Sequence, residues 1–279
     1  MGQAIAQQLK RNGFAVYTAL DGRSARSRAL AAAAGISDLG TLDQLAARCD
    51  VILSIMNPGA ALEFAQSLAQ SIARAGTRPL VVDCNAIAPT TMHAVHAALS
   101  AVGAHSLDAG MFSPPPCDGA HGRLFVSGPG ADALNAFATP EMSVRVLSDR
   151  IGDASALKML DAVISKGVTA LVLQMLIAAK RYGVAEELEE QFTPARRRIY
   201  DVVIDALPIM PSKSYRWVPE VMEIAKTLEA VGVTPTMIEG AAEVYDFVAR
   251  TALGRQTPEQ RDRALDGRGV VEQLAGEPW

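Results

Sequence analysis

The residues that could bind a nucleotide stand near the start of the chain. Gly2 opens a predicted helix, and about twenty residues later the turn Asp21-Gly22-Arg23-Ser24 follows a short apolar segment. In a dinucleotide-binding unit, a buried strand and a G-x-G-x-x-G turn precede this helix, and the acidic residue binds the adenosine ribose. In that register Gly2 is the third glycine, and we expect the first strand and the first two glycines to be missing. The alternative is that Gly2 simply begins an ordinary helix.

The same turn admits two kinds of ribose recognition. Asp21 could accept hydrogen bonds from the ribose hydroxyls, which favours NAD. Arg23 and Ser24, with Arg26 on the next turn, could instead hold a 2′-phosphate, which favours NADP. We favour NADP, with NAD as the alternative, because two nearby guanidinium groups would balance the carboxylate. The remaining interpretation is that these are only solvated turn residues.

The first half of the chain alternates between short apolar runs and amphipathic segments. This alternation predicts a Rossmann-like, doubly wound parallel sheet with helices on both faces. Because ligands bind at the carboxyl ends of such strands, we expect Met56 and Asn57 to pass over the adenosine side of a cofactor. The expected strands are 14–20, 49–56, 79–83, 104–109, 123–127 and 144–147, and the expected helices are 2–11, 24–34, 60–75 and 90–102.

The second half predicts helices alone. We expect an α/β domain over residues 1–150 and an all-α domain over residues 151–279. The most apolar run, 167–179, is shorter than the roughly twenty residues that a membrane-spanning helix needs, which favours a buried core helix. The polar tail from Thr257 is expected to be loosely held. The expected helices are 152–182, 184–206, 218–230 and 235–252.

The composition argues against several classes of function. The formal net charge is −4, whereas nucleic-acid binders usually carry a strong basic excess and electrostatic membrane anchors carry basic segments. Cys49, Cys84 and Cys117 lie far apart with no CxxC pair, so neither a disulfide framework nor a metal site is expected. The first residues do not form a signal peptide. We therefore expect a cytoplasmic protein that acts on a small molecule.

Several segments, taken together and in order, resemble the β-hydroxyacid dehydrogenase superfamily, which includes 3-hydroxyisobutyrate and 6-phosphogluconate dehydrogenases. More narrowly, the chain resembles the NAD(P)-dependent oxidoreductases whose C-terminal domain is similar to that of phosphogluconate dehydrogenase. Each motif alone is weak, whereas their order and spacing are fairly specific. The matching segments are Met1-Gly-Gln-Ala-Ile-Ala6, Leu20-Asp-Gly-Arg-Ser24, Val51-Ile-Leu-Ser-Ile55, Val82-Asp-Cys-Asn-Ala-Ile-Ala-Pro89, Leu107-Asp-Ala-Gly110, Ile151-Gly-Asp-Ala-Ser-Ala-Leu-Lys-Met159 and Gly240-Ala-Ala-Glu-Val-Tyr245.

The resemblance implies a catalytic role for Lys158, which stands in a glycine-x-x-x-x-x-lysine pattern that starts at Gly152. In that chemistry the ammonium group protonates the substrate carbonyl during reduction, or accepts the hydroxyl proton during oxidation, while hydride moves to or from the nicotinamide. Without the resemblance, a surface lysine paired with Asp161 would be the simpler interpretation. The resemblance also implies that Asn85 approaches the nicotinamide and the substrate, although an asparagine before Pro89 could equally form a turn.

Two positions depart from the family pattern. Many relatives have an asparagine four residues after the lysine, where this chain has Ala162. In the substrate loop Ser113 stands one place late, and prolines follow it where relatives have glycines. Proline has no backbone N–H, so a loop of amides that grips a carboxylate is weakened. These departures put the substrate class in doubt rather than the hydride chemistry.

The sequence therefore predicts an NAD(P)-dependent dehydrogenase or reductase that acts on a hydroxy acid or a related alcohol or carbonyl compound. The resemblance and the apolar helix imply a homodimer. Two alternatives remain: an inactive, N-terminally truncated or non-catalytic nucleotide-binding homologue, and an imine reductase on the same scaffold. The retained lysine weighs against the second alternative, because relatives that reduce imines commonly replace it.

Overall fold

The computed structural model describes residues 1–112 and 121–279. The chain forms two compact units, Met1–Met159 and Leu160–Trp279. We call them the α/β unit and the helical unit, and each is described by itself. The α/β unit is Rossmann-like and the second unit is helical, so the predicted fold class is confirmed.

The α/β unit contains a five-stranded sheet in the order β3-β4-β5-β6-β7. The strands β3, β4 and β5 are parallel, β6 is antiparallel to β5, and β7 is parallel to β6. The short strands β1 and β2 form a separate parallel pair. The strand bounds are Tyr17–Thr18 (β1), Ser37–Asp38 (β2), Val51–Ser54 (β3), Leu80–Asp83 (β4), His105–Phe112 (β5), Gly122–Ser127 (β6) and Met142–Ser148 (β7).

Two apolar cores cover the two faces of this sheet. One contains buried side chains of α3, α4 and α5, and the other contains those of α1 and the 3-10 helix η2. The neighbouring residues Val81 and Val82 of β4 belong to opposite cores, as the alternation of side chains along a strand requires. The helix bounds are Gly2–Arg11 (α1), Ala25–Ala33 (α2), Leu42–Arg48 (α3), Ala61–Ala75 (α4), Pro89–Ser100 (α5) and Ala131–Phe137 (η2).

Two elements of this unit were not predicted. The helix α3 is capped by Thr41 and Gln44, whose side chains satisfy each other's backbone N–H groups. This S/T-x-x-E/Q capping box is visible in the sequence and could have located the helix. The strand β2 has two residues, both exposed, so hydropathy carries no signal for it. The expected strand 14–20 contains only the two residues of β1.

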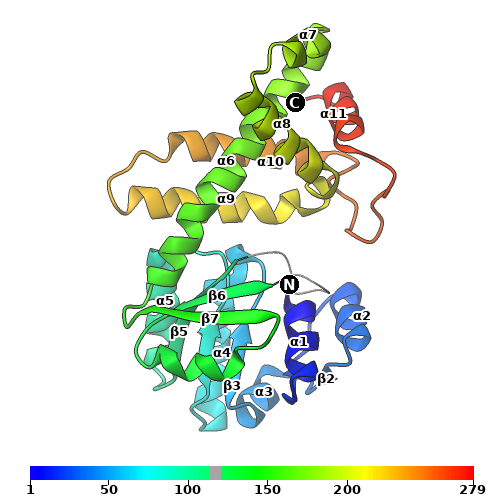
Figure 1. The fold of residues 1–279 in the computed structure, drawn as a ribbon. Coiled ribbons are helices and arrows are strands. Elements are labelled where there is room, and N and C mark those ends of the chain that lie inside the picture. The colour runs from blue at the N-terminus through cyan, green and yellow to red at the C-terminus, as the bar shows by residue number, and fades with distance from the viewer. Residues whose placement is uncertain (113–120) are drawn as a thin grey trace. The chain divides into compact units, whose positions relative to one another are not determined.

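The long helix α6, Asp153–Tyr182, begins in the α/β unit and continues into the helical unit. By length and composition alone it could cross a membrane, but 44% of its most apolar window is buried within the protein. The other helices are Ala185–Glu190 (α7), Pro194–Ala206 (α8), Ser214–Glu229 (α9), Thr236–Arg250 (α10) and Gly267–Gly276 (α11). Figure 1 shows α9 and α10 side by side.

Two expectations for the helical unit are wrong. The segment 184–206 is not one helix, because Thr193 caps a new helix whose first residue is Pro194. The polar tail is not loosely held throughout. Its last part folds into α11, which Asp266 caps through a 2.8 Å hydrogen bond from the Gly269 N–H. Val270, Val271 and Leu274 of α11 are buried, so an apolar face hidden among polar residues holds the tail down.

Candidate active site

Asn85 joins the carboxyl ends of β3 and β4. Its side-chain oxygen accepts a hydrogen bond from the Met56 N–H at 2.6 Å, and its side-chain nitrogen donates to Ser54 and Asp83, each at 2.8 Å. The side chain is 4% exposed. Asn85 and Met56, both predicted, therefore lie in direct contact. Ser54 and Asp83, which were not predicted, complete this cluster.

Asp83 is a buried carboxyl group at the centre of the same cluster. Burial raises its pKa to about 6, although hydrogen bonds from Asn85 and Ser54 oppose the shift and the nearby charge of Asp108 adds to it. Beside it, burial raises the pKa of the Cys84 thiol well above its usual value. Both groups thus favour their neutral forms more strongly than exposed ones do.

The N-terminus of α1 lies against the end of β3. A Cβ at Gly2 would lie 3.8 Å from the Ile55 Cβ, which is ordinary van der Waals contact. No side chain caps this helix, and its first turn holds no acidic residue. Uncapped N–H groups and the positive end of the helix dipole suit a diphosphate. Asn57 follows at the same edge, where its side chain accepts a hydrogen bond from the Gly59 N–H.

The predicted ribose turn follows β1. Asp21, Arg23 and Ser24 are all exposed there. The backbone is fixed by hydrogen bonds from Asp21 N–H to the Gly40 carbonyl and from Arg23 N–H to the Leu20 carbonyl. Ser24 caps α2 by accepting from the Ser27 N–H at 3.2 Å. The charged side chains of this turn therefore face solvent from a fixed backbone. They fit a dinucleotide whose ribose carries a charged group.

Lys158 lies in the α/β unit, half-buried on the first turns of α6. Its ammonium nitrogen is 4.7 Å from the centre of the Phe112 ring, at the carboxyl end of β5. Asp83, the last residue of β4, is the partner of Asp108 in the parallel β4–β5 register, and Asn85 follows β4. A Cβ at Gly110 would lie 3.2 Å from the Lys158 Cβ. Lys158 and Asn85 thus stand at the ends of neighbouring parallel strands.

Comparison with known proteins identifies the scaffold. A family model described as the NAD binding domain of 6-phosphogluconate dehydrogenase matches residues 1–128, and a domain of unknown function, DUF1932, matches residues 179–248. The structure of Mycobacterium tuberculosis 3-hydroxyisobutyrate dehydrogenase is similar, with a TM-score of 0.65 and 17% identity over 98% of this chain and 95% of that one. The sequence match over residues 1–128 and the shared fold support the β-hydroxyacid dehydrogenase superfamily.

Two further solved structures resemble this chain. A conserved hypothetical protein from Sinorhizobium meliloti 1021 is 27% identical with a TM-score of 0.62, and the match covers 98% of this chain and 92% of that one. An imine reductase variant from Myxococcus stipitatus, solved with NAD+, is 15% identical with a TM-score of 0.56, over 98% of this chain and 95% of that one. The fold is therefore shared by 3-hydroxyisobutyrate dehydrogenases and imine reductases.

The structure defines two residues of α6 that follow Lys158. Ala162 is buried, and its side chain has no hydrogen-bonding group. The Lys166 ammonium lies 3.1 Å from a Glu220 carboxylate oxygen and 4.3 Å from the centre of the Trp217 ring. Ser113 lies outside the described residues. Among residues 1–112 and 121–279, no three His, Cys, Asp or Glu side chains gather as a metal site would need.

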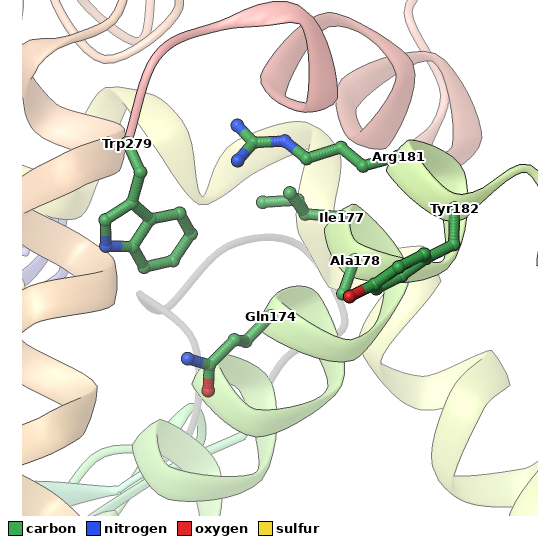
Figure 2. Close-up of a pocket in the computed structure, with 6 residues that line it drawn as sticks. All are labelled: Gln174, Ile177, Ala178, Arg181, Tyr182 and Trp279. Atoms are coloured by element: carbon green, nitrogen blue, oxygen red, sulfur yellow. The ribbon is translucent and has the colours of Figure 1, made fainter.

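The helical unit has a pocket, shown in Figure 2. Arg181 at its rim donates hydrogen bonds to the backbone carbonyls of Ala275 and Glu277, at 3.1 and 2.5 Å. The Trp279 ring stacks on Phe247 with ring centres 4.4 Å apart. The polar and aromatic groups thus hold the C-terminal segment in place. The lining residues are Gln174, Ile177, Ala178, Arg181, Tyr182 and Trp279.

The raised pKa of Asp83 predicts a specific pH dependence of stability. Because the folded protein binds this proton more tightly than the unfolded chain does, the free energy of unfolding should fall as the pH rises from about 4 to about 6. The slope from one such group is at most about 1.4 kcal/mol per pH unit. Urea unfolding across this range should show a smaller decline for Asp83→Asn than for the wild type.

The exposed carboxylate Asp132 supplies the matched control. Asp132→Asn should keep the wild-type dependence of unfolding free energy on pH between 4 and 6. If Asp83→Asn keeps it as well, the burial of a titrating Asp83 is not the cause of the slope.

Proposed function

We propose that this protein is an NAD(P)-dependent dehydrogenase or reductase that acts on a hydroxy acid or a related carbonyl compound, with Lys158 as the general acid and base. The observation that carries the proposal is the position of Lys158, half-buried above the Phe112 ring at the carboxyl end of β5. Ligands of parallel α/β sheets bind at this edge. A cation held there can stabilise an oxygen as it gains negative charge.

Lys158 supplies the proton-transfer half of the reaction. During reduction its ammonium donates a hydrogen bond and then a proton to the carbonyl oxygen, and during oxidation its amine accepts the hydroxyl proton. The Phe112 ring stabilises the ammonium form through its electron-rich face. A bound nicotinamide supplies or accepts the hydride.

The nucleotide would lie across the other predicted residues. The uncapped α1 N-terminus at Gly2 receives the diphosphate, and Met56 and Asn57 flank the adenosine side. Asn85 fixes the strand ends beneath the nicotinamide through its bonds to Met56 and Asp83. Arg23 and Ser24 favour the 2′-phosphate of NADP, while Asp21 leaves NAD as the second choice. We further propose that the enzyme is cytoplasmic.

Lys158→Ala should remove activity while leaving cofactor binding intact. Loss of a general acid typically costs a factor of about 10² to 10⁴ in rate. The assay is NADPH or NADH oxidation and NADP⁺ or NAD⁺ reduction with a panel of hydroxy acids, the matching carbonyl compounds and a cyclic imine. Fluorescence titration with NADPH should give the wild-type Kd for the variant.

Lys180→Ala is the matched control, because Lys180 lies at the far end of the same helix in an exposed ion pair with Glu272. It should keep wild-type turnover. Wild-type turnover in Lys158→Ala would overturn the assigned role, and turnover of the imine alone would favour imine reduction.

Arg23→Ala should discriminate between the two cofactors. If the guanidinium holds the 2′-phosphate, its loss should raise the KM for NADPH by about tenfold or more and leave the KM for NADH within about twofold. Steady-state kinetics with both cofactors make the measurement. Equal effects on both constants would show that Arg23 does not read the 2′-phosphate.

A homodimer is proposed from the surface of the helical unit. Among the described residues, every exposed large hydrophobic side chain except Met1 and Leu157 belongs to that unit. Leu160, Ile164 and Leu171 form a stripe along α6, with Ile164 71% and Leu171 64% exposed. An exposed apolar stripe of this kind is typical of a protein–protein interface. A second copy of this chain is the proposed partner.

Ile164→Glu combined with Leu171→Glu should convert the dimer to a monomer, because each places a charge in the proposed apolar interface. Size-exclusion chromatography with light scattering gives the mass directly. Ala133→Glu, an exposed change in the α/β unit, should leave the dimer intact. A monomeric wild type, or a dimeric double variant, would contradict the proposed interface.

A further inference from the structure

The helix that carries Lys158 is attached to the sheet by one buried carboxylate. Asp108 of β5 is 1% exposed. One of its oxygens accepts hydrogen bonds from the N–H groups of Gly152 and Ser155, at 3.0 and 2.9 Å, and from the Ser127 hydroxyl at 3.1 Å. Its other oxygen accepts from the Ser155 hydroxyl at 2.7 Å. Four donors thus converge on this group.

Ser127 extends the attachment to a second strand. It is the partner of Asp108 in the β5–β6 register, and its hydroxyl oxygen accepts the Ala154 N–H at 3.0 Å. The backbone N–H groups at a helix start have no partners within the helix. At the start of α6, Asp108 and Ser127 accept hydrogen bonds from the backbone N–H groups of Gly152, Ala154 and Ser155. Gly152 enters this turn at φ +100, a conformation that favours glycine.

The same face of β5 also sets the environment of Lys158. Alternate residues of a strand share a face, so Asp108, Gly110 and Phe112 lie in one row. A Cβ at Gly110 would lie 3.0 Å from the Ala154 carbonyl oxygen, so the strand and α6 approach closely there. Phe112 places its ring beneath the ammonium. One row of three residues thus fixes the helix start, the close approach and the side chain.

We propose that Asp108 is a positioning residue that holds the first turn of α6, and through it the Lys158 ammonium, at the reacting edge of the sheet. This inference rests on the function proposed above. It follows that the Asp108 carboxylate matters for rate more than for cofactor affinity, because a displacement of about 1 Å between reacting groups can cost about 10²-fold in rate. Asp108 itself need not touch the substrate.

The test is a graded series of variants. Asp108→Asn replaces the carboxylate by a neutral amide, which weakens the charge-assisted hydrogen bonds from the Gly152 and Ser155 N–H groups. Ser127→Ala removes the hydrogen bond that the Ser127 hydroxyl oxygen accepts from the Ala154 N–H. Ser155→Ala removes only the hydrogen bond from the Ser155 hydroxyl to Asp108. The turnover number should fall by about 10- to 100-fold in Asp108→Asn, about 3- to 10-fold in Ser127→Ala and less than about 3-fold in Ser155→Ala. The KM for NADPH should stay within about twofold of the wild-type value in all three variants.

Ser106→Ala is the matched control on the same strand. Ser106 is equally buried and makes a 2.7 Å hydrogen bond with His96 of α5 rather than with α6. It should lower the melting temperature without lowering turnover. The proposal is overturned if turnover falls in proportion to melting temperature in all the variants, Ser106→Ala included. Asp108 then has only a structural role.

Amide hydrogen exchange supplies a readout that does not depend on activity. Exchange at residues 152–156 should rise at least about tenfold in Asp108→Asn and stay at the wild-type rate in Ser106→Ala. Unchanged exchange in Asp108→Asn overturns the anchor itself, and raised exchange with full turnover overturns the positioning role. A wild type inactive on every substrate of the panel overturns the proposed function and the rate effect, while the exchange result still decides the anchor.

Discussion

The buried carboxylate of Asp108 at the start of α6 is the constraint on which the candidate site depends. A helix that begins against the sheet must find acceptors for its first N–H groups away from water, since an unsatisfied buried N–H costs about 1–3 kcal/mol. Asp108 and Ser127 provide them from two adjacent strands. Burial raises the pKa of Asp108, and the hydrogen bonds from Ser155, Ser127 and Gly152 oppose that shift. The result is a fixed start for the helix that carries Lys158.

The same principle operates one strand away. Asn85 and Asp83 tie the ends of β3 and β4 together with a set of hydrogen bonds that leaves both side chains buried. These hydrogen bonds fix the carboxyl ends of β3 and β4 relative to each other. A rigid edge suits hydride chemistry, because donor, acceptor and proton source must be held in one geometry.

Sequence reasoning located the strands other than β2 and most helices, because their apolar runs and periodicity are strong. It placed Met56 and Asn85 at strand ends and Lys158 on a long helix. It did not find the role of Asp108 or Ser127, because single polar residues within apolar strands have no pattern that predicts their partners. It also missed α11, whose buried apolar side chains Val270, Val271 and Leu274 lie within a polar tail. The ion pair between Lys166 and Glu220 has no sequence signal either, because the two residues lie far apart in the chain.

The most direct test of the account is a crystal structure of the protein with NADP⁺ and a hydroxy acid that it oxidises slowly. The account predicts the nicotinamide at the carboxyl ends of β4 and β5, and the Lys158 nitrogen within about 3 Å of the substrate hydroxyl. It also predicts that Asp108 still accepts the Gly152 and Ser155 N–H groups in the complex. A nucleotide bound elsewhere, or a Lys158 nitrogen beyond hydrogen-bond reach of the substrate, would contradict it.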